Sequence, residues 1–373
     1  MALHIQPYRA EHEPAVADFN RRIRAAGEDE NLVFYQSATP RWLPPASSSR
    51  IHNEFFLAIA NDGVHGGYAL KTQDFLLPDG QIRSIGYYHH PLSEGIVDKA
   101  HAAIGMLLLR DAITRSPLLY CLGMGGYERP LPQMLIRLGW SHFAVPFFFR
   151  VLRPAKFLRQ MQTLRHSAAR RLALDLAAFT GAGWLGTKLF QSYRALTSPR
   201  VKRSEALEVQ IFSQETQSLW VDARSNCSLT AVRDHQTLRL LYPGSESHLS
   251  RIEVRRDGRL IGWAVVGERR HDAKYGNLRV GSVVDNWAFP GESLSIVQHA
   301  TQVLERQGFD LILTNQGHQG WGRAFLASGY LPGPSNFLFA ASRKLSELLE
   351  PFDHVKLRMH LTRADGDGLP RNF

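Results

Sequence analysis

The sequence contains few cysteines and no long uncharged hydrophobic run. Only Cys121 and Cys227 occur among its 373 residues, without a CxxC pair. This excludes a disulfide framework and favours a reducing, cytosolic compartment. No apolar stretch reaches the roughly 20 residues that span a bilayer. The first residues also lack a charged segment followed by an apolar core, so we expect neither a transmembrane helix nor a signal peptide.

Acidic residues are scarce in one segment. Residues 150–203 contain 12 Lys and Arg against Asp175 alone, a net charge of +11, whereas the whole chain carries +10, which leaves −1 for the remainder. A near-neutral remainder argues against a protein that coats nucleic acid over its whole surface. We expect the basic segment, residues 154–203, to be a helical connector.

This connector has the pattern of a basic amphipathic helix. Its apolar positions recur at helical spacing among arginines: Phe157, Met161, Leu164 and Ala168, with Arg159, Arg165, Arg170 and Arg171. Three roles stay open for it. The connector can lie on anionic lipid at the inner face of the membrane, contact tRNA phosphates, or pack between two domains with its arginines in solvent.

The rest of the sequence repeats one order of elements. A buried strand, a glycine turn, a helix and an apolar strand are expected over residues 118–152, and the same order returns over 311–342. A hairpin, a strand and a helix come before each: 55–71, 82–88 and 96–113 in the first half, and 252–266, 280–287 and 293–307 in the second. We predict two domains, 1–153 and 204–345. Residues 346–373 then form a C-terminal helix or strand, with 355–362 as a half-buried strand, and a flexible tail.

This order, with a helix that ends in Leu138-Gly139-Trp140 or Ser328-Gly329-Tyr330, resembles the GNAT acyltransferase superfamily. The doubled form looks like tandem GNAT proteins of bacterial envelope and polysaccharide synthesis, and like Fem-type aminoacyl transferases. Residues 232–243 are similar to the helix that opens the second half of such tandem proteins. The resemblance implies an α/β fold of two tandem mixed β-sheets flanked by helices. It also implies that two parallel strands separate and that an acyl thioester, of CoA or a carrier protein, lies between them with its diphosphate at a helix N-terminus.

Neither half has the glycine-rich phosphate loop of that family. Residues 91–95 and 290–293 follow the corresponding strands, and they place Glu94 and Glu292 where a diphosphate would bind. We therefore expect weak binding of acetyl-CoA. The resemblance implies acyl or aminoacyl transfer to an amine or hydroxyl of an envelope or polysaccharide precursor. The alternatives are a Fem-like enzyme that uses aminoacyl-tRNA and an inactive scaffold that docks on a membrane or a protein.

Polar residues near the ends of the expected strands are the site candidates. Glu94 and His90 are candidates for a general base, and the alternatives are a carboxylate that caps a helix and a hydrogen-bonded imidazole. The donor-binding candidates, which a tight turn would also explain, are Ser93, Gly95, Gly123, Gly125 and Gly126. The acceptor-binding candidates, in what is otherwise a solvated loop, are Asn315, His318, Gln319 and Trp321.

No metal site is expected. His89 and His90 are neighbours on a strand and point to opposite faces, so they are poorly placed to bind one ion. The run Asp365-Gly366-Asp367-Gly368 lacks the third ligand and the closing Glu of a calcium loop, and we expect it to belong to the flexible tail.

Overall fold

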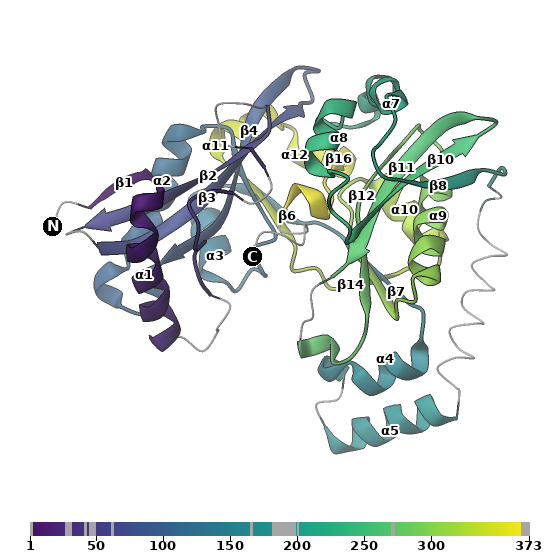
Figure 1. Ribbon diagram of the computed structural model, residues 1–373, viewed down its shortest axis with the longest axis horizontal. Coiled ribbons are helices and arrows are strands. Elements are labelled where there is room, and N and C mark those ends of the chain that lie inside the picture. The colour runs from purple at the N-terminus through teal and green to yellow at the C-terminus, as the bar shows by residue number, and fades with distance from the viewer. Residues whose placement is uncertain are drawn as a thin grey trace. The chain divides into compact units, whose positions relative to one another are not determined.

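The computed structural model describes residues 3–26, 32–40, 43–44, 50–60, 63–164, 167–180, 199, 201–269 and 273–366. These residues form two compact units, each built on one mixed sheet flanked by helices (Figure 1). The first unit contains the described residues up to 143 and residues 338–352, and the second contains residues 144–337 and 353–366. Several expectations fall on residues outside these ranges: the turn residues Asn61-Asp62, Arg165, residues 181–198 of the connector, and Asp367-Gly368.

The sheet of the first unit has the strand order β1-β2-β3-β4-β5-β15-β6. Its strands are β1 (His4–Pro7), β2 (His52–Ala60), β3 (Gly63–Leu76), β4 (Ile82–Ser93), β5 (Leu119–Leu122), β6 (Ser141–Ala144) and β15 (Leu338–Ala341). Neighbours from β1 to β4 are antiparallel, whereas β4 and β5 are parallel. The helices of this unit are α1 (Glu13–Ala26), α2 (Ile104–Arg115), α3 (Pro130–Arg137) and α11 (Arg343–Leu348).

Both faces of this sheet are covered, which explains the apolar run in β2. Leu57 packs with Phe19 of α1 on one face, and Phe56 packs with Leu108 of α2 and Leu135 of α3 on the other. Successive residues of a strand point to opposite faces, so a strand buried on both sides is apolar without alternation. The sheet therefore forms the middle layer of the first unit.

The sheet of the second unit has the strand order β14-β7-β13-β12-β11-β10-β8. Its strands are β7 (Phe147–Val151), β8 (Glu205–Val209), β10 (Leu249–Arg256), β11 (Arg259–Glu268), β12 (Val280–Ala288), β13 (Leu311–Asn315) and β14 (Leu331–Gly333), and β9 (Leu229–Ala231) pairs with β16 (Met359–His360). The helices are α4 (Pro154–Gln160), α5 (Ala168–Phe179), α7 (Glu215–Ala223), α8 (His235–Leu241), α9 (Ser293–Arg306), α10 (Gln319–Ala327) and α12 (Phe352–Val355). The expected α/β fold with two mixed sheets and flanking helices is confirmed.

The two halves of the sequence exchange a strand. β7 comes from the first half, but it pairs antiparallel with β13 of the second unit, with Val151 opposite Leu311. β15 comes from the second half and pairs with β5 of the first unit, with Phe339 opposite Leu122. The units therefore divide at 143/144 and 337/338 instead of at the predicted 153 and 345. Periodicity identifies an apolar strand but not its partner, because strand pairing is a non-local contact.

Several predicted elements differ in extent. The helix expected from residue 96 begins at Ile104, because the Asp98 side chain accepts from Ala100 N–H and starts a separate 3-10 turn. The strand expected over 355–362 is wrong: α12, a 3-10 turn and the two-residue β16 stand there. Asp365, expected in the flexible tail, is only 2% exposed. The helix α7 was missed.

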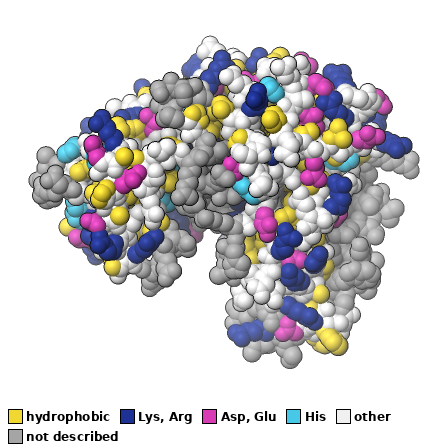
Figure 2. All heavy atoms as spheres, viewed as in Figure 1, with side chains coloured by type: hydrophobic (Ala, Val, Ile, Leu, Met, Phe, Trp, Pro, Cys, Tyr) yellow, Lys and Arg dark blue, Asp and Glu magenta, His cyan; other side chains and the backbone are white. Residues whose placement is uncertain are grey.

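The first helix of the connector packs on the second unit. Phe157 and Met161 contact an apolar cluster that includes Leu278 and Leu313, and Lys156 Nζ lies 2.5 Å from Asp310 Oδ2. Packing is therefore the observed role of α4. On α5, Leu176 and Phe179 are 60% and 82% exposed, and Lys and Arg side chains are spread over this part of the surface (Figure 2). Among the described residues, no helix combines the length and the apolar character needed to cross a membrane.

Candidate functional site

The parallel strands β4 and β5 separate soon after they begin to pair. Their only paired positions are Gly86 with Leu119 and Tyr87 with Tyr120, although β4 continues to Ser93. Beyond that point β4 contains a bulge, since His90 and Pro91 together stand opposite the single residue between Gly67 and Ala69 of β3. His90 has a φ of 50°. A bulge bends its strand and increases the local twist, so β4 diverges from β5 beyond Tyr87, whose hydroxyl donates to Leu122 O at 2.8 Å.

The second unit repeats this geometry. β12 and β13 pair only from Val280 with Leu311 to Ser282 with Leu313, while β12 continues to Ala288. Val284 is the extra residue of a bulge in β12, because Asp285 and Val283 pair with consecutive residues of β11. The same strand in each half therefore carries a bulge and parts from its parallel neighbour. This supports the predicted duplication.

In the second unit, residues 359–365 cross the place where the strands separate. Leu361 O accepts a 2.8 Å hydrogen bond from Gly317 N, just after β13. Arg363 donates to Asn315 Oδ1 at 2.8 Å, and Thr362 donates to Asp285 Oδ1 of β12 at 3.0 Å. The segment thus contacts both diverging strands, and Leu361 and Thr362 are fully buried. In the second unit, the place where the strands separate is therefore occupied by the unit's own chain.

A buried ionic network fixes this segment. Arg233 is 1% exposed and donates to Asp285 at 3.0 Å and to Asp365 at 2.8 Å. Tyr242 donates to Asp285 Oδ2 at 2.7 Å. Burial raises the pKa of the Asp285 carboxyl, and the Arg233 guanidinium opposes that shift. Arg233 and Tyr242 both lie within residues 232–243, the stretch that is similar to tandem proteins, and both belong to this structural network.

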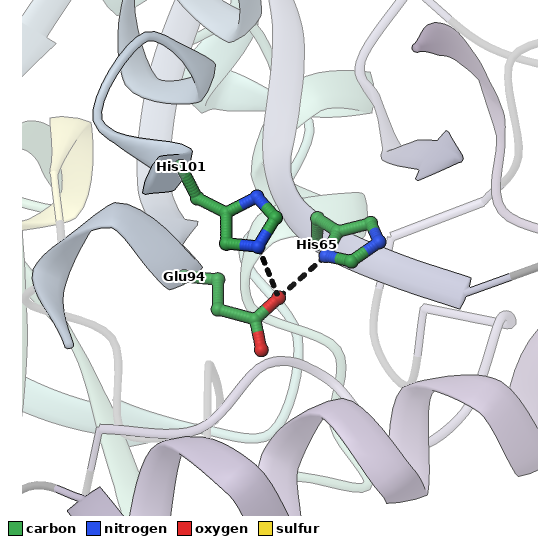
Figure 3. Close-up of side chains that lie close together, drawn as sticks. All are labelled: His65, Glu94 and His101. Carbon is green, nitrogen blue, oxygen red and sulfur yellow. Dashed lines mark hydrogen bonds and ion pairs between the residues drawn. The ribbon is translucent and has the colours of Figure 1, made fainter. Parts of the chain in front are cut away.

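In the first unit, β4 ends at a cluster of charged and imidazole side chains (Figure 3). Glu94 begins the 3-10 turn Glu94–Ile96. Its Oε1 accepts a 2.7 Å hydrogen bond from Arg22 Nε of α1, and its Oε2 lies 2.5 Å from His65 Nδ1 of β3. His101 Nε2, from the 3-10 turn Lys99–His101, is 4.0 Å from the same oxygen. The side chains of Glu94, His65 and His101 are 10%, 16% and 25% exposed, so solvent reaches the cluster.

These contacts fix the protonation of Glu94. Burial alone would raise the pKa of Glu94, but hydrogen bonds from Arg22 and His65 hold it below the usual value. Glu94 is therefore ionised at neutral pH. Because an ionised carboxylate only accepts hydrogen bonds, His65 donates to it from Nδ1. Glu94 thus orients the His65 imidazole.

The second predicted base has different partners. His90 Nε2 lies 2.6 Å from Val33 O, and its ring lies beside Phe34 and Tyr35 with centroids 6.0 and 5.0 Å away. Glu94 and His90, the two candidates for the general base, are thus each held by their own neighbours. The neighbouring His89 is buried, and burial holds its pKa well below the usual value.

The predicted donor-binding residues have local structural roles. Ser93 Oγ accepts from Gly95 N–H at 3.1 Å. A Cβ added to Gly95 would lie 2.6 Å from His101 O, so glycine lets the turn that carries His101 approach Glu94. Gly123, Gly125 and Gly126 all have positive φ, as a tight turn requires. Gly123 N–H is used by Leu338 O at 3.0 Å, which removes it as a donor to a substrate.

Three of the four predicted acceptor-binding residues are buried. Asn315 is bound to Arg363, and His318 caps α10 by accepting from Gly320 N–H at 3.1 Å. Trp321 belongs to the core of the second unit. Of this group, only Gln319 is exposed. The solvated loop expected here is instead a well-packed turn, and a substrate role for its buried members finds no support in their contacts.

Sequence reasoning missed Arg22, His65 and His101. They come from a helix, a strand and a 3-10 turn that are far apart in the sequence, and none belongs to a recognisable motif. The one available signal was that Glu94 follows a strand directly, which marked the position but not its partners.

No protein-family model matches this sequence, and no curated protein is similar to it. Solved structures do share its fold. The chain is similar to N-myristoyltransferase from Saccharomyces cerevisiae, solved with bound myristoyl-CoA and inhibitors, with a TM-score of 0.53 and 10% identity over 91% of this chain and 79% of that one. It is also similar to a probable N-acyltransferase of unknown function from Enterococcus faecalis V583, with a TM-score of 0.52 and 9% identity over 94% and 74% of the two chains. These likenesses show the fold.

Proposed function

We propose that this protein is an acyltransferase and that its first unit carries the reaction. The observation that supports this most is the contrast between the two places where parallel strands separate. Residues 359–365 bridge β12 and β13 beyond their last pair, whereas β4, beyond its last pair with β5, leads into the solvent-accessible group of Glu94, His65 and Arg22. The fold, shared with two proteins described as N-acyltransferases, is consistent with acyl transfer.

The donor in this proposal is an acyl thioester, such as the acyl-CoA bound in the yeast enzyme. An amine or hydroxyl of the acceptor attacks the thioester carbonyl, a C–N or C–O bond forms, and the C–S bond breaks. His65 takes the proton of the acceptor while Glu94 holds its Nδ1–H, and the thiol leaves with a proton. An envelope or polysaccharide precursor as acceptor, and aminoacyl-tRNA as an alternative donor, are carried over from the sequence resemblance.

A matched pair of variants tests the first unit. Glu292 is the counterpart of Glu94, since it also follows the long strand of its sheet, precedes a helix and binds an arginine, Arg256. Glu94→Gln should lower release of CoA thiol from an acyl-CoA panel because it weakens the contact that orients the proposed base His65, and loss of the base itself would cost at least about 100-fold. Glu292→Gln should leave it unchanged. Equal effects of the two variants, or full activity of Glu94→Gln, would contradict the assignment.

The donor itself is tested by calorimetric titration. Because neither unit has a glycine-rich phosphate loop, we expect acetyl-CoA to bind weakly. Sub-micromolar binding of acetyl-CoA would contradict this expectation. Turnover of a charged tRNA without turnover of any acyl-CoA would support the aminoacyl-tRNA alternative, and no turnover of either would support an inactive scaffold.

A further inference from the structure

We propose that His65, Glu94 and His101 form a binding site for a divalent transition-metal ion with a preference for nitrogen ligands, such as Zn²⁺. Each side chain offers one ligand atom, and these atoms all lie within 4.8 Å of one another. Figure 3 shows both imidazoles directed at the same carboxylate oxygen of Glu94. This inference goes beyond acyl transfer and does not depend on it.

The distances require only a small adjustment. Zinc binds imidazole nitrogen and carboxylate oxygen at about 2.0–2.2 Å, so two ligand atoms of a tetrahedral site lie about 3.4 Å apart. Here Glu94 Oε2 is 2.5 Å from His65 Nδ1 and 4.0 Å from His101 Nε2. A movement of the carboxylate oxygen away from His65 and towards His101 brings both distances close to that value. The ligand atoms of the two imidazoles already lie within 4.8 Å of each other.

The surroundings hold the three ligands in place. Arg22 binds Glu94 Oε1 at 2.7 Å and reaches Oε2 only at 3.4 Å, and it also donates to Val64 O at 2.6 Å. The arginine thus holds Oε1 firmly, and Oε2 faces the two imidazoles. The His65 and His101 rings stack with centroids 4.6 Å apart and an angle of 23° between their planes. Mutation of residues that orient metal ligands in this way typically weakens metal binding by about 10–100-fold. The site therefore has an outer layer as well as three ligands.

The three ligand atoms indicate the class of ion and its coordination. Two imidazoles and one carboxylate suit Zn²⁺ and related ions better than Mg²⁺ or Ca²⁺, which prefer oxygen. Three protein ligands leave a fourth position for water or a substrate group. The ion also replaces the Nδ1 proton that His65 donates to Glu94. The ion-bound form and the form proposed for acyl transfer consequently exclude each other.

Isothermal titration of the full chain, stripped with a chelator, tests this inference in the absence of any acyl donor. We expect one Zn²⁺ to bind per chain, with no comparable binding of Mg²⁺. His65→Ala, Glu94→Gln and His101→Ala should each weaken binding by at least about 100-fold, and Arg22→Gln by about 10-fold. His354→Ala is the matched control, because His354 is exposed and lies outside the cluster.

His101→Ala decides the test if other variants fail to fold, since His101 is the most exposed of the three ligands. The absorption spectrum of bound Co²⁺ gives a second readout, with an intense visible band expected for the tetrahedral site and its loss in His101→Ala. Absence of Zn²⁺ binding, or binding that the His101 and Glu94 variants leave unchanged, would overturn the proposal. Absence of acyl transfer by the native chain, together with ion binding that the variants weaken as expected, would overturn only the proposed function.

Discussion

The two units share one strand geometry but place different side chains beside it. In each, a bulged strand separates from its parallel neighbour. In the second unit, Arg233, Asp285 and Asp365 form a network at this place that is at most 2% exposed. In the first, Arg22 and Glu94 form an ion pair whose arginine is 43% exposed. Two units with the same strand geometry can thus differ in their side chains: one is packed internally at this place, and the other has charged groups within reach of solvent.

The glycines of the two hairpins show how closely the copies agree. A Cβ on Gly66 would lie 2.8 Å from Leu92 O and 3.0 Å from Ile104 of the following helix. A Cβ on Gly262 would lie 2.6 Å from Trp287 O and 2.6 Å from Ile296 of the following helix. Both positions need glycine because strand and helix approach there. The two units therefore pack strand and helix alike, and they differ in the side chains near the place where the parallel strands separate.

The largest expected difference in stability between the two units follows from removing the arginine of each network. Arg233→Met leaves two buried carboxylates without their partner, and breaking a buried pair in this way costs about 3–5 kcal/mol. Arg22→Met removes an arginine whose side chain is 43% exposed, so water can partly replace it beside Glu94, and we expect a smaller loss, nearer the roughly 1 kcal/mol of exposed ion pairs. Urea unfolding followed by circular dichroism measures both free energies of unfolding. Similar losses for the two variants would mean that the networks do not differ as their burial suggests.

The paired glycines should behave alike. Gly66→Ala and Gly262→Ala each force a methyl group against a strand carbonyl and a helix side chain, and overpacking of this kind costs about 1–3 kcal/mol. The same urea titrations measure the loss. Gly105→Ala is the control, because a Cβ there meets nothing within 4 Å. A loss at only one of the two glycines would show that the copies pack differently at this position.

Much of the fold was predictable because its signals are local. The hairpins, the helix at 293–306 and the repeat itself follow from apolar periodicity and turn residues. The exchange of β7 and β15 was not predictable, since an apolar strand such as Phe147–Val151 carries no mark of its partner. The burial of Asp365 was not predictable for the same reason. Its ion-pair partner Arg233 lies 132 positions away in the sequence.

The candidate site was predictable only at one position. Glu94 stood out because a carboxylate directly follows a strand, and its position at the end of β4 is as expected. Its partners His65 and Arg22 lie 29 and 72 residues away in the sequence. Conversely, His318 and Trp321 were predicted to bind a substrate because they are polar or aromatic in a glycine-rich turn. In the structure both are buried, His318 caps α10 and Trp321 packs in the core.

The smallest expected effect concerns α5, which has no counterpart in the first unit. Arg170 and Arg171 lie on the helix that exposes Leu176 and Phe179, and each basic residue near an anionic membrane contributes about 1 kcal/mol. We expect flotation with anionic liposomes at low salt, lost at high salt and absent with neutral lipid. Arg170→Gln and Arg171→Gln should each weaken it about fivefold, whereas Arg343→Gln, an exposed arginine of the first unit, should not. Without flotation under any of these conditions, the connector has no membrane role. Salt-sensitive binding of tRNA in its place would assign the same charge to phosphate contacts.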